Sequence, residues 1–178
     1  MDVGDKKSIE KARDTIKEKH GGLDVLVNNA GVLQLLPESG NSGLMDLKRY
    51  LSIQAGKATF ETNFLDLLDI CNVFFPILRD HARVVHIRIA KTGNSVDHGY
   101  PDFFGPYSMT KISVNALTRL QQRNLDGDKN HTDIIVNACC PGHVATDLNN
   151  HSGTRTVEER TDNPVYLATL PATRSSED

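Results

Sequence analysis

The stretch LDVLVNNAG, Leu23–Gly31, indicates the fold class of this 178-residue chain most directly. A short apolar run ends in a turn of small and amide residues, which is typical of a buried parallel strand that leads into a loop. Two later runs have the same character, RVVHIRI at Arg83–Ile89 and IIVNACC at Ile134–Cys140, the second closed by Pro141-Gly142. We expect three strands.

Helical patterns separate these strands. Apolar residues recur at helical spacing in three segments, Asp5–His20, Lys57–Leu78 and Tyr107 to about Asn124. The first has Ser8 as a possible cap and Gly21-Gly22 as a stop signal. Strands that alternate with helices predict an α/β layered fold with a parallel sheet.

The two remaining central segments are irregular. Glycine, serine and proline are scattered through Val32–Gly56, where only a short helix near Met45–Leu51 is expected. The second segment, Ala90–Gly105, is polar and carries glycine. Both segments are expected to be loops, and the length suits one domain.

Composition and charge limit the kinds of molecule that this chain is expected to bind. The formal net charge of -3 and the pI of about 6.1 argue against binding nucleic acid or a membrane surface by charge. No apolar run approaches the ~20 residues that span a bilayer, and the N-terminus lacks the apolar stretch of a secretory signal. Three cysteines without metal-ligand spacing fit buried packing in a reducing, cytoplasmic setting. No metal site is expected.

Tyr107 and Lys111 are the first candidates for catalysis. They lie four residues apart at the start of an expected helix, so both side chains would leave one face. A free tyrosine has a pKa near ~10, and a nearby ammonium group lowers it toward the range of a general acid. An exposed helix face with no catalytic role gives the same spacing. Other motifs are therefore needed to show whether this pair is catalytic.

Three motifs stand in a fixed order along the chain. The turn Asn28–Gly31 follows the first strand, Tyr107 and Lys111 follow the second, and Pro141-Gly142 with Thr146 follows the third. Doubly wound sheets bind ligands in a crevice at the carboxyl ends of their strands. The order therefore predicts one shared site at that edge of the sheet.

These motifs resemble the short-chain dehydrogenase/reductase family. The runs GGLDVLVNNAGV, NACCPG and NPVYLATLP are most similar to its monomeric carbonyl reductases, which act with NADPH. The resemblance implies a partial Rossmann-like, doubly wound parallel sheet that lacks the first βαβ unit and the last strand. Residues 1–178 would form a single incomplete Rossmann-type domain, truncated at both ends and internally.

The resemblance also implies roles for individual residues. Tyr107 would protonate the alkoxide that forms as a carbonyl is reduced. Lys111 would lower the pKa of that phenol and bind the nicotinamide ribose, and Asn63 would help to hold a water in the proton relay. The cofactor would in addition contact Asp2, Val3, Asn29, Val144, Ala145 and Thr146.

The sequence departs from the family pattern at two places. No G-x-G-x-x-G occurs in the 178 residues, although the family binds the pyrophosphate at such a turn. Arg88 and Ile89 stand where the family carries two serines, one of them catalytic. Thr92 or Ser95 replaces that hydroxyl only if the following loop folds back, and an internal deletion would account for the change.

The expected function is NADPH-dependent reduction of aldehydes, ketones or quinones to alcohols, with a small carbonyl compound as the partner. Full-length relatives of this kind are expected to be monomeric. The alternative is a catalytically impaired truncated isoform or fragment that acts only as a binding partner. This chain is also expected to associate through strand edges that the missing strands leave open.

Overall fold

The computed structural model describes residues 1–32, 53–87, 105–142, 144–145, 151 and 156–173. A parallel three-stranded sheet forms its centre, in the order β1-β2-β3. Its strands are β1 (Leu23–Asn28), β2 (Leu78–Ile87) and β3 (Ile135–Cys139). The expected α/β class and parallel sheet are confirmed.

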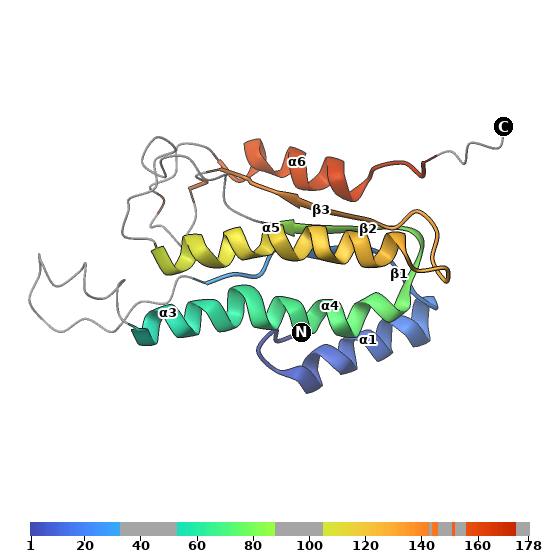
Figure 1. Ribbon diagram of the computed structural model, residues 1–178, viewed down its shortest axis with the longest axis horizontal. Coiled ribbons are helices and arrows are strands. Elements are labelled where there is room, and N and C mark those ends of the chain that lie inside the picture. The colour runs from blue at the N-terminus through green and yellow to red at the C-terminus, as the bar shows by residue number, and fades with distance from the viewer. Residues whose placement is uncertain (33–52, 88–104, 143, 146–150, 152–155, 174–178) are drawn as a thin grey trace, which may run out of the picture.

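Helices cover both faces of this sheet (Figure 1). The first face carries α1 (Lys6–His20), α4 (Leu67–Phe74) and α5 (Gly105–Asp126). On the opposite face, α6 (Glu158–Ala168) lies across β1 and β2. This arrangement is the doubly wound one that the sequence predicts, although α6 itself was not among the expected helices.

The caps of α1 differ in part from expectation. Asp5, not Ser8, is the N-cap, because its carboxylate accepts a hydrogen bond from the backbone N–H of Lys7. The Ser8 hydroxyl instead accepts from the N–H of Asp2. Gly21 ends the helix at a φ of 76°, where glycine pays no steric penalty, so the expected stop is confirmed.

The helix expected over Lys57–Leu78 is broken into several pieces. It begins earlier, at Ile53, and ends before Leu78, which belongs to β2. A π-helical turn interrupts it in the middle, and Pro76 lies in a closing 3-10 turn. In order, the pieces are α3 (Ile53–Phe60), η1 (Glu61–Asp66), α4 and η2 (Phe75–Ile77).

Strand β2 also begins earlier than expected, at Leu78 instead of Arg83. Leu23 lies opposite Leu78 and Val25 lies opposite Arg83, so β2 carries extra residues at this point. His81, with a φ of 65°, lies within the irregular part. From Arg83 on, the pairing is regular, and that part is the one that the apolar pattern reveals.

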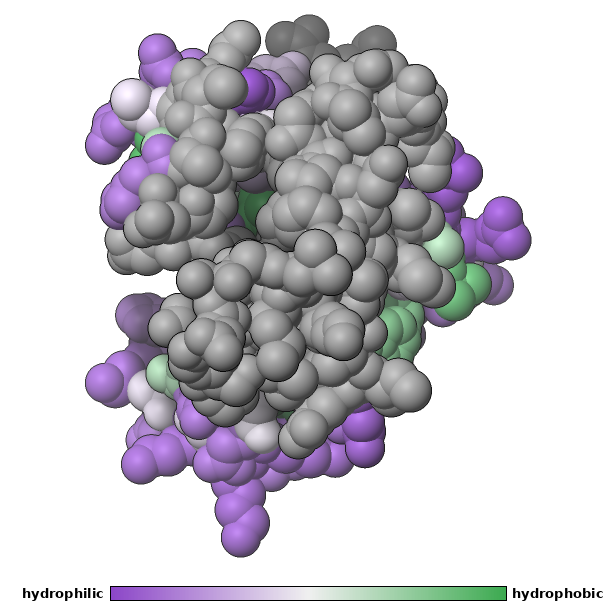
Figure 2. Space-filling view, turned by 90° about the vertical axis from the view of Figure 1, so that its left-hand side faces the viewer, coloured by the Kyte–Doolittle hydropathy of each residue, from purple (hydrophilic) through white to green (hydrophobic). Residues whose placement is uncertain are grey.

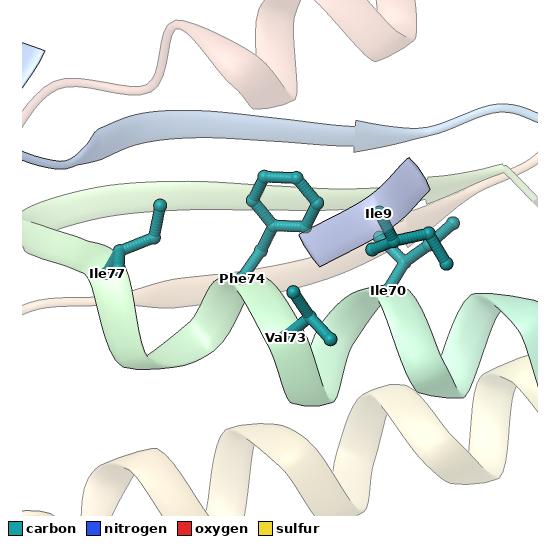
Figure 3. Packing of buried hydrophobic residues seen from close by; sticks show 5 residues of the cluster. All are labelled: Ile9, Ile70, Val73, Phe74 and Ile77. Atoms are coloured by element: carbon teal, nitrogen blue, oxygen red, sulfur yellow. The ribbon is translucent and has the colours of Figure 1, made fainter. Parts of the chain in front are cut away.

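The core fills the space between the helices and the sheet. Figure 3 shows one cluster, in which Ile9 of α1 meets residues of α4 and η2, and Phe74 points toward the strands. Each such side chain contributes about 1.5–3 kcal/mol when it is fully buried. The cluster consists of Ile9, Ile70, Val73, Phe74 and Ile77. This packing fixes α1 and α4 against the sheet.

Two expectations lie outside the described residues, the short helix near Met45–Leu51 and the loop Ala90–Gly105 up to residue 104. Within the described part of the chain, no helix is both long and apolar enough to cross a membrane.

Candidate active site

The carboxyl ends of the three strands meet at one edge of the sheet, on the left in Figure 1. Asn28 of β1 lies opposite His86 of β2, and Ile87 lies opposite Cys139 of β3. Helix α5 begins at the same edge. The three sequence motifs therefore come together at one end of the molecule.

Asn63 ties the turn after β1 to the helical layer. Its Oδ1 accepts from the backbone N–H of Val32 at 2.7 Å, and its Nδ2 donates to the Val32 carbonyl at 2.9 Å. The side chain is completely buried within the π-helical turn η1. Such turns are rare and frequent at functional sites, and the periodicity of the sequence gives no sign of this one.

The same amide reaches α5. Nδ2 of Asn63 lies 3.4 Å from Oγ1 of Thr110, which is itself fully buried. Thr110 directly precedes Lys111, and Tyr107 lies one turn earlier in α5. The backbone therefore places both positions on consecutive turns, but their side chains lie outside what the structure describes. The expected pairing of phenol and ammonium remains a prediction.

The two asparagines after β1 face different surroundings. Asn28 is buried, with only 7% of its surface exposed, whereas Asn29 and Ala30 are exposed. Within the described residues, the Asn29 side chain makes no hydrogen bond, so its amide is free to meet a ligand. Asn28 instead belongs to the interior.

A buried polar network holds Asn28, and no motif in the sequence predicts it. Its Nδ2 lies 3.0 Å from Nδ1 of His86, and Nε2 of His86 lies 2.8 Å from Oε1 of Gln121 on α5. These contacts fit a neutral His86 that carries its proton on Nε2. Burial lowers the pKa of His86, and the Gln121 hydrogen bond only partly opposes that shift.

Cys71 completes this network from α4. Its Sγ lies 3.7 Å from Nδ2 of Asn28, and burial raises the pKa of the thiol to about 11. A thiol with so high a pKa stays protonated and unreactive at neutral pH. Cys71 and Cys139 are buried, as expected, whereas Cys140 is only half-buried and accepts a hydrogen bond from the N–H of Gly142.

The loop after β3 forms the third side of the site. Gly142 has a φ of 77°, a conformation that favours glycine, and Val144 and Ala145 are half-buried beyond it. Thr146 lies outside the described residues, as do Arg88, Ile89, Thr92 and Ser95.

The N-terminal candidates lie beside η1. The Asp2 carboxylate accepts from the N–H of Gly4 at 3.0 Å, and Val3 packs against the core cluster of α1 and α4. A Cβ on residue 4 would lie 3.7 Å from Oδ1 of Asp2 and 3.8 Å from Oδ2 of Asp66, so these two carboxylates lie near each other at η1. Burial is the main cause that raises the pKa of Asp66, and the charge of Asp2 adds to it. A contact with adenine stays a prediction for Asp2 and Val3.

Figure 2 looks onto the edge where the strands end. The described residues that rim this face are mainly hydrophilic, and the apolar residues that show are most extensive on the right of the view. Within the described ranges, no three His, Cys, Asp or Glu side chains gather closely enough to hold a metal ion.

Comparison with known proteins agrees with this architecture. Residues 1–156 match the family model for short chain dehydrogenases. The chain belongs to the short chain dehydrogenase family. It is therefore an oxidoreductase by family, as the sequence motifs predict.

Among its curated relatives are mammalian carbonyl reductases. This short chain dehydrogenase is 34% identical over 209 residues to carbonyl reductase (NADPH) 3 of Mus musculus, covering 96% of the chain and 71% of the relative. It is 30% identical over 210 residues to carbonyl reductase (NADPH) 1 of Bos taurus, covering 97% of the chain and 72% of the relative.

Solved structures share the fold. Salutaridine reductase from Papaver somniferum aligns with a TM-score of 0.73 at 23% identity, over 99% of this chain and 79% of that one. A short chain dehydrogenase from Burkholderia cenocepacia, solved in complex with NADP, aligns with a TM-score of 0.64 at 26% identity. That match covers 86% of this chain and 55% of the other. The Rossmann-like assignment is confirmed.

Proposed function

We propose that this short chain dehydrogenase reduces small carbonyl compounds, such as aldehydes, ketones or quinones, to alcohols with NADPH. The observation that carries the proposal is Asn63, whose amide joins the turn after β1 to the α5 turn that precedes Lys111. The names of the mammalian relatives support the substrate class and the cofactor.

The residues at this edge fit the nicotinamide end of a dinucleotide. Asn29 offers an exposed amide with no partner among the described residues, and Gly142 turns the loop after β3 at a φ of 77°, which favours glycine. Val144, Ala145 and Thr146 would border the ring, and Lys111 would bind its ribose. When bound, the cofactor supplies the hydride that the reduction consumes.

Tyr107 would be the general acid in this site. Its hydroxyl would give a proton to the carbonyl oxygen, which gains negative charge as the carbon is reduced. The pKa of a phenol must fall by about 3 units from ~10 to serve at neutral pH, and a neighbouring ammonium favours that shift. Lys111, one turn further along α5, would provide the charge.

Asn63 would act by positioning its neighbours. The two N–H groups of Nδ2 have two acceptors, the Val32 carbonyl and the Thr110 hydroxyl, and Oδ1 accepts from Val32. With these contacts made, the side chain is better suited to hold the turn against α5 than to donate a proton. We therefore assign it a supporting role in the proton relay.

A second candidate function has one observation in its favour. Val25 and Val27 of β1 are 40% and 44% exposed, so an apolar surface lies open at this strand. A chain that only binds a partner would use such a surface and would need no catalytic tyrosine.

An activity assay separates the two functions. The purified chain is mixed with NADPH and an aromatic aldehyde or a quinone, and the loss of reduced-nicotinamide absorbance is followed. We expect turnover that falls by about 10²-fold or more in Tyr107→Phe, because general acid catalysis contributes about that factor. Tyr166→Phe is the matched control, since Tyr166 is 65% exposed on α6. Folded protein without turnover above background would reject the reductase proposal.

A further inference from the structure

Arg160, in the first turn of α6, lies directly against the loop after β3. A Cβ on residue 142 would lie 2.7 Å from Nη2 of Arg160 and 2.8 Å from its Cζ. Only glycine leaves room for the guanidinium at this point. Gly142 also has a φ of 77°, so the loop and the arginine fit each other at the carboxyl edge of the sheet.

One nitrogen of the guanidinium has no partner there. Nε of Arg160 is buried and forms no hydrogen bond, and it is the one buried side-chain nitrogen or oxygen in the described part of the chain with this property. Buried polar groups are nearly always satisfied, so an exception needs a physical explanation. Arg83 shows the contrast, since its buried guanidinium donates to six carbonyl or carboxylate oxygens of the surrounding chain.

Glu159, the acid next to Arg160 in the sequence, is engaged elsewhere. Oε2 of Glu159 accepts from the N–H of Thr156 at 3.0 Å, and the Thr156 hydroxyl accepts from the N–H of Glu159 at 3.3 Å. This reciprocal pair caps the helix and uses two of its terminal groups. None of the ion pairs between described residues includes Arg160.

We propose that Arg160 binds a phosphate oxyanion at the carboxyl edge of the sheet. Its planar, permanently charged fork suits a phosphate, which can accept two parallel hydrogen bonds. The proposal rests on the proposed function in one respect. The Gly142–Ala145 loop is assigned to the nicotinamide end of NADPH, so the phosphate would be that of the dinucleotide's pyrophosphate.

The test measures binding without relying on turnover. Inorganic pyrophosphate, sodium acetate and NADPH are titrated separately into the wild type, Arg160→Gln and Arg119→Gln by calorimetry. We expect Arg160→Gln to weaken pyrophosphate and NADPH at least tenfold, while Arg119→Gln, which removes an exposed charge from α5, stays within twofold. Unchanged pyrophosphate binding in Arg160→Gln would overturn the proposal. Acetate bound as tightly as pyrophosphate would overturn the assignment to phosphate.

The outcomes also separate this site from the proposed function. Pyrophosphate binding that depends on Arg160, without any NADPH binding, would keep the anion site and reject the cofactor. NADPH bound equally by wild type and Arg160→Gln would keep the cofactor and reject the site.

If Arg160→Gln does not fold, the NMR signal of the Nε–H groups in wild-type protein labelled with ¹⁵N-arginine tests the proposal instead. We expect the Arg160 signal, identified by its absence from Arg160→Lys or by through-bond assignment, to shift on addition of pyrophosphate. A signal that does not move at saturation would overturn the proposal.

Discussion

His86 is fully buried at the centre of a network that joins two strands of the sheet to the helices α4 and α5. Asn28 comes from β1, Gln121 from α5 and Cys71 from α4. The Cys71 thiol stays neutral because burial raises its pKa to about 11. His86 is thus surrounded by neutral polar groups, none of which stabilises an added proton by charge.

This environment predicts a stability that depends on pH. Burial lowers the pKa of His86 in the folded chain. At a pH near or below about 6.5, the pKa of a histidine in the unfolded chain, the unfolded chain therefore binds more protons than the folded chain. The free energy of unfolding should therefore fall as the pH decreases from about 7.5 to about 5. Urea titrations at each pH measure this slope.

Substitution of His86 isolates the effect. In His86→Asn the slope should become shallower, whereas His20→Asn, at an exposed position without a side-chain partner among the described residues, should keep it. His86→Leu should cost about 2 kcal/mol or more at neutral pH, because Asn28 and Gln121 lose a buried partner. An identical slope in wild type and His86→Asn would show that another group is responsible.

For single residues, the sequence predicted where a residue lies in the fold better than which side chains it contacts. Asn29 follows β1 at the edge where the motifs predict the site, and Asn63, chosen from the family resemblance, bonds to the turn after that strand. The pairing of His86 with Gln121 could not be read from the chain, because the two residues are 35 positions apart and meet only through the packing of α5 against the sheet.

Among the elements, α6 is held to the sheet at its C-terminal end by buried contacts of Arg83 and Asp133, which we call the clasp. Arg83 of β2 is 2% exposed, and its guanidinium donates to the carbonyls of Leu170 and Pro171, just after α6. It also pairs with the Asp133 carboxylate at 3.1 Å. Asp133 in turn accepts from the backbone N–H and the hydroxyl of Thr173. The end of the chain's described part is thereby fastened to the sheet.

Removing one partner of this clasp should be costly. Arg83→Met leaves the Asp133 carboxylate nearly buried without its countercharge, and such changes cost about 3–5 kcal/mol. Arg79→Met is the control, because Arg79 pairs with Asp24 at an exposed site where ion pairs contribute about 0–1 kcal/mol. Unfolding in urea, followed by circular dichroism, compares them. An equal loss of unfolding free energy in Arg83→Met and Arg79→Met would contradict a stabilising role for the clasp.

The clasp also predicts loss of stability in acid. Burial alone would raise the pKa of Asp133, but hydrogen bonds from Thr173, His81 and Arg83 outweigh it and hold the pKa below its usual range. The stabilisation is therefore present above the unfolded value of about 3.9 and decreases as the pH falls below it. The Asp133→Asn variant should lack this acidic decrease, and an equal decrease in both proteins would assign it to other carboxylates.

Regular elements were predictable, whereas their interruptions were not. Apolar periodicity located α1, α5 and the regular part of each strand. It missed the π-helical turn, since one additional residue in a turn leaves most of the apolar spacing intact. It also missed α6, which has no buried residue and therefore no clear apolar stripe.

For the whole molecule, the open side of the sheet is the feature with a direct consequence. Strand β1 pairs with β2 on one side, and no strand among the described residues pairs with its other side. The backbone groups of that side and the exposed Val25 and Val27 form a surface suited to association.

We expect the purified chain to self-associate as its concentration rises, and Val27→Lys to reduce that association. A charge on an edge strand opposes pairing with another chain. Sedimentation velocity over a range of concentrations measures the effect, with Leu120→Lys as the control, because Leu120 is 54% exposed on α5, away from the edge. A wild type that stays monomeric throughout would contradict this expectation.

The central claim is that the edge where the three strands end is a carbonyl-reducing site. The most direct measurement uses NADPH that carries deuterium at C4 of the nicotinamide, in the transferred position, with an aromatic aldehyde as substrate. Mass spectrometry of the alcohol should find one deuterium on the former carbonyl carbon with the wild type, and only background incorporation with Tyr107→Phe. Folded wild-type protein that yields no deuterated alcohol, or a Tyr107→Phe variant that yields as much as the wild type, would contradict the account.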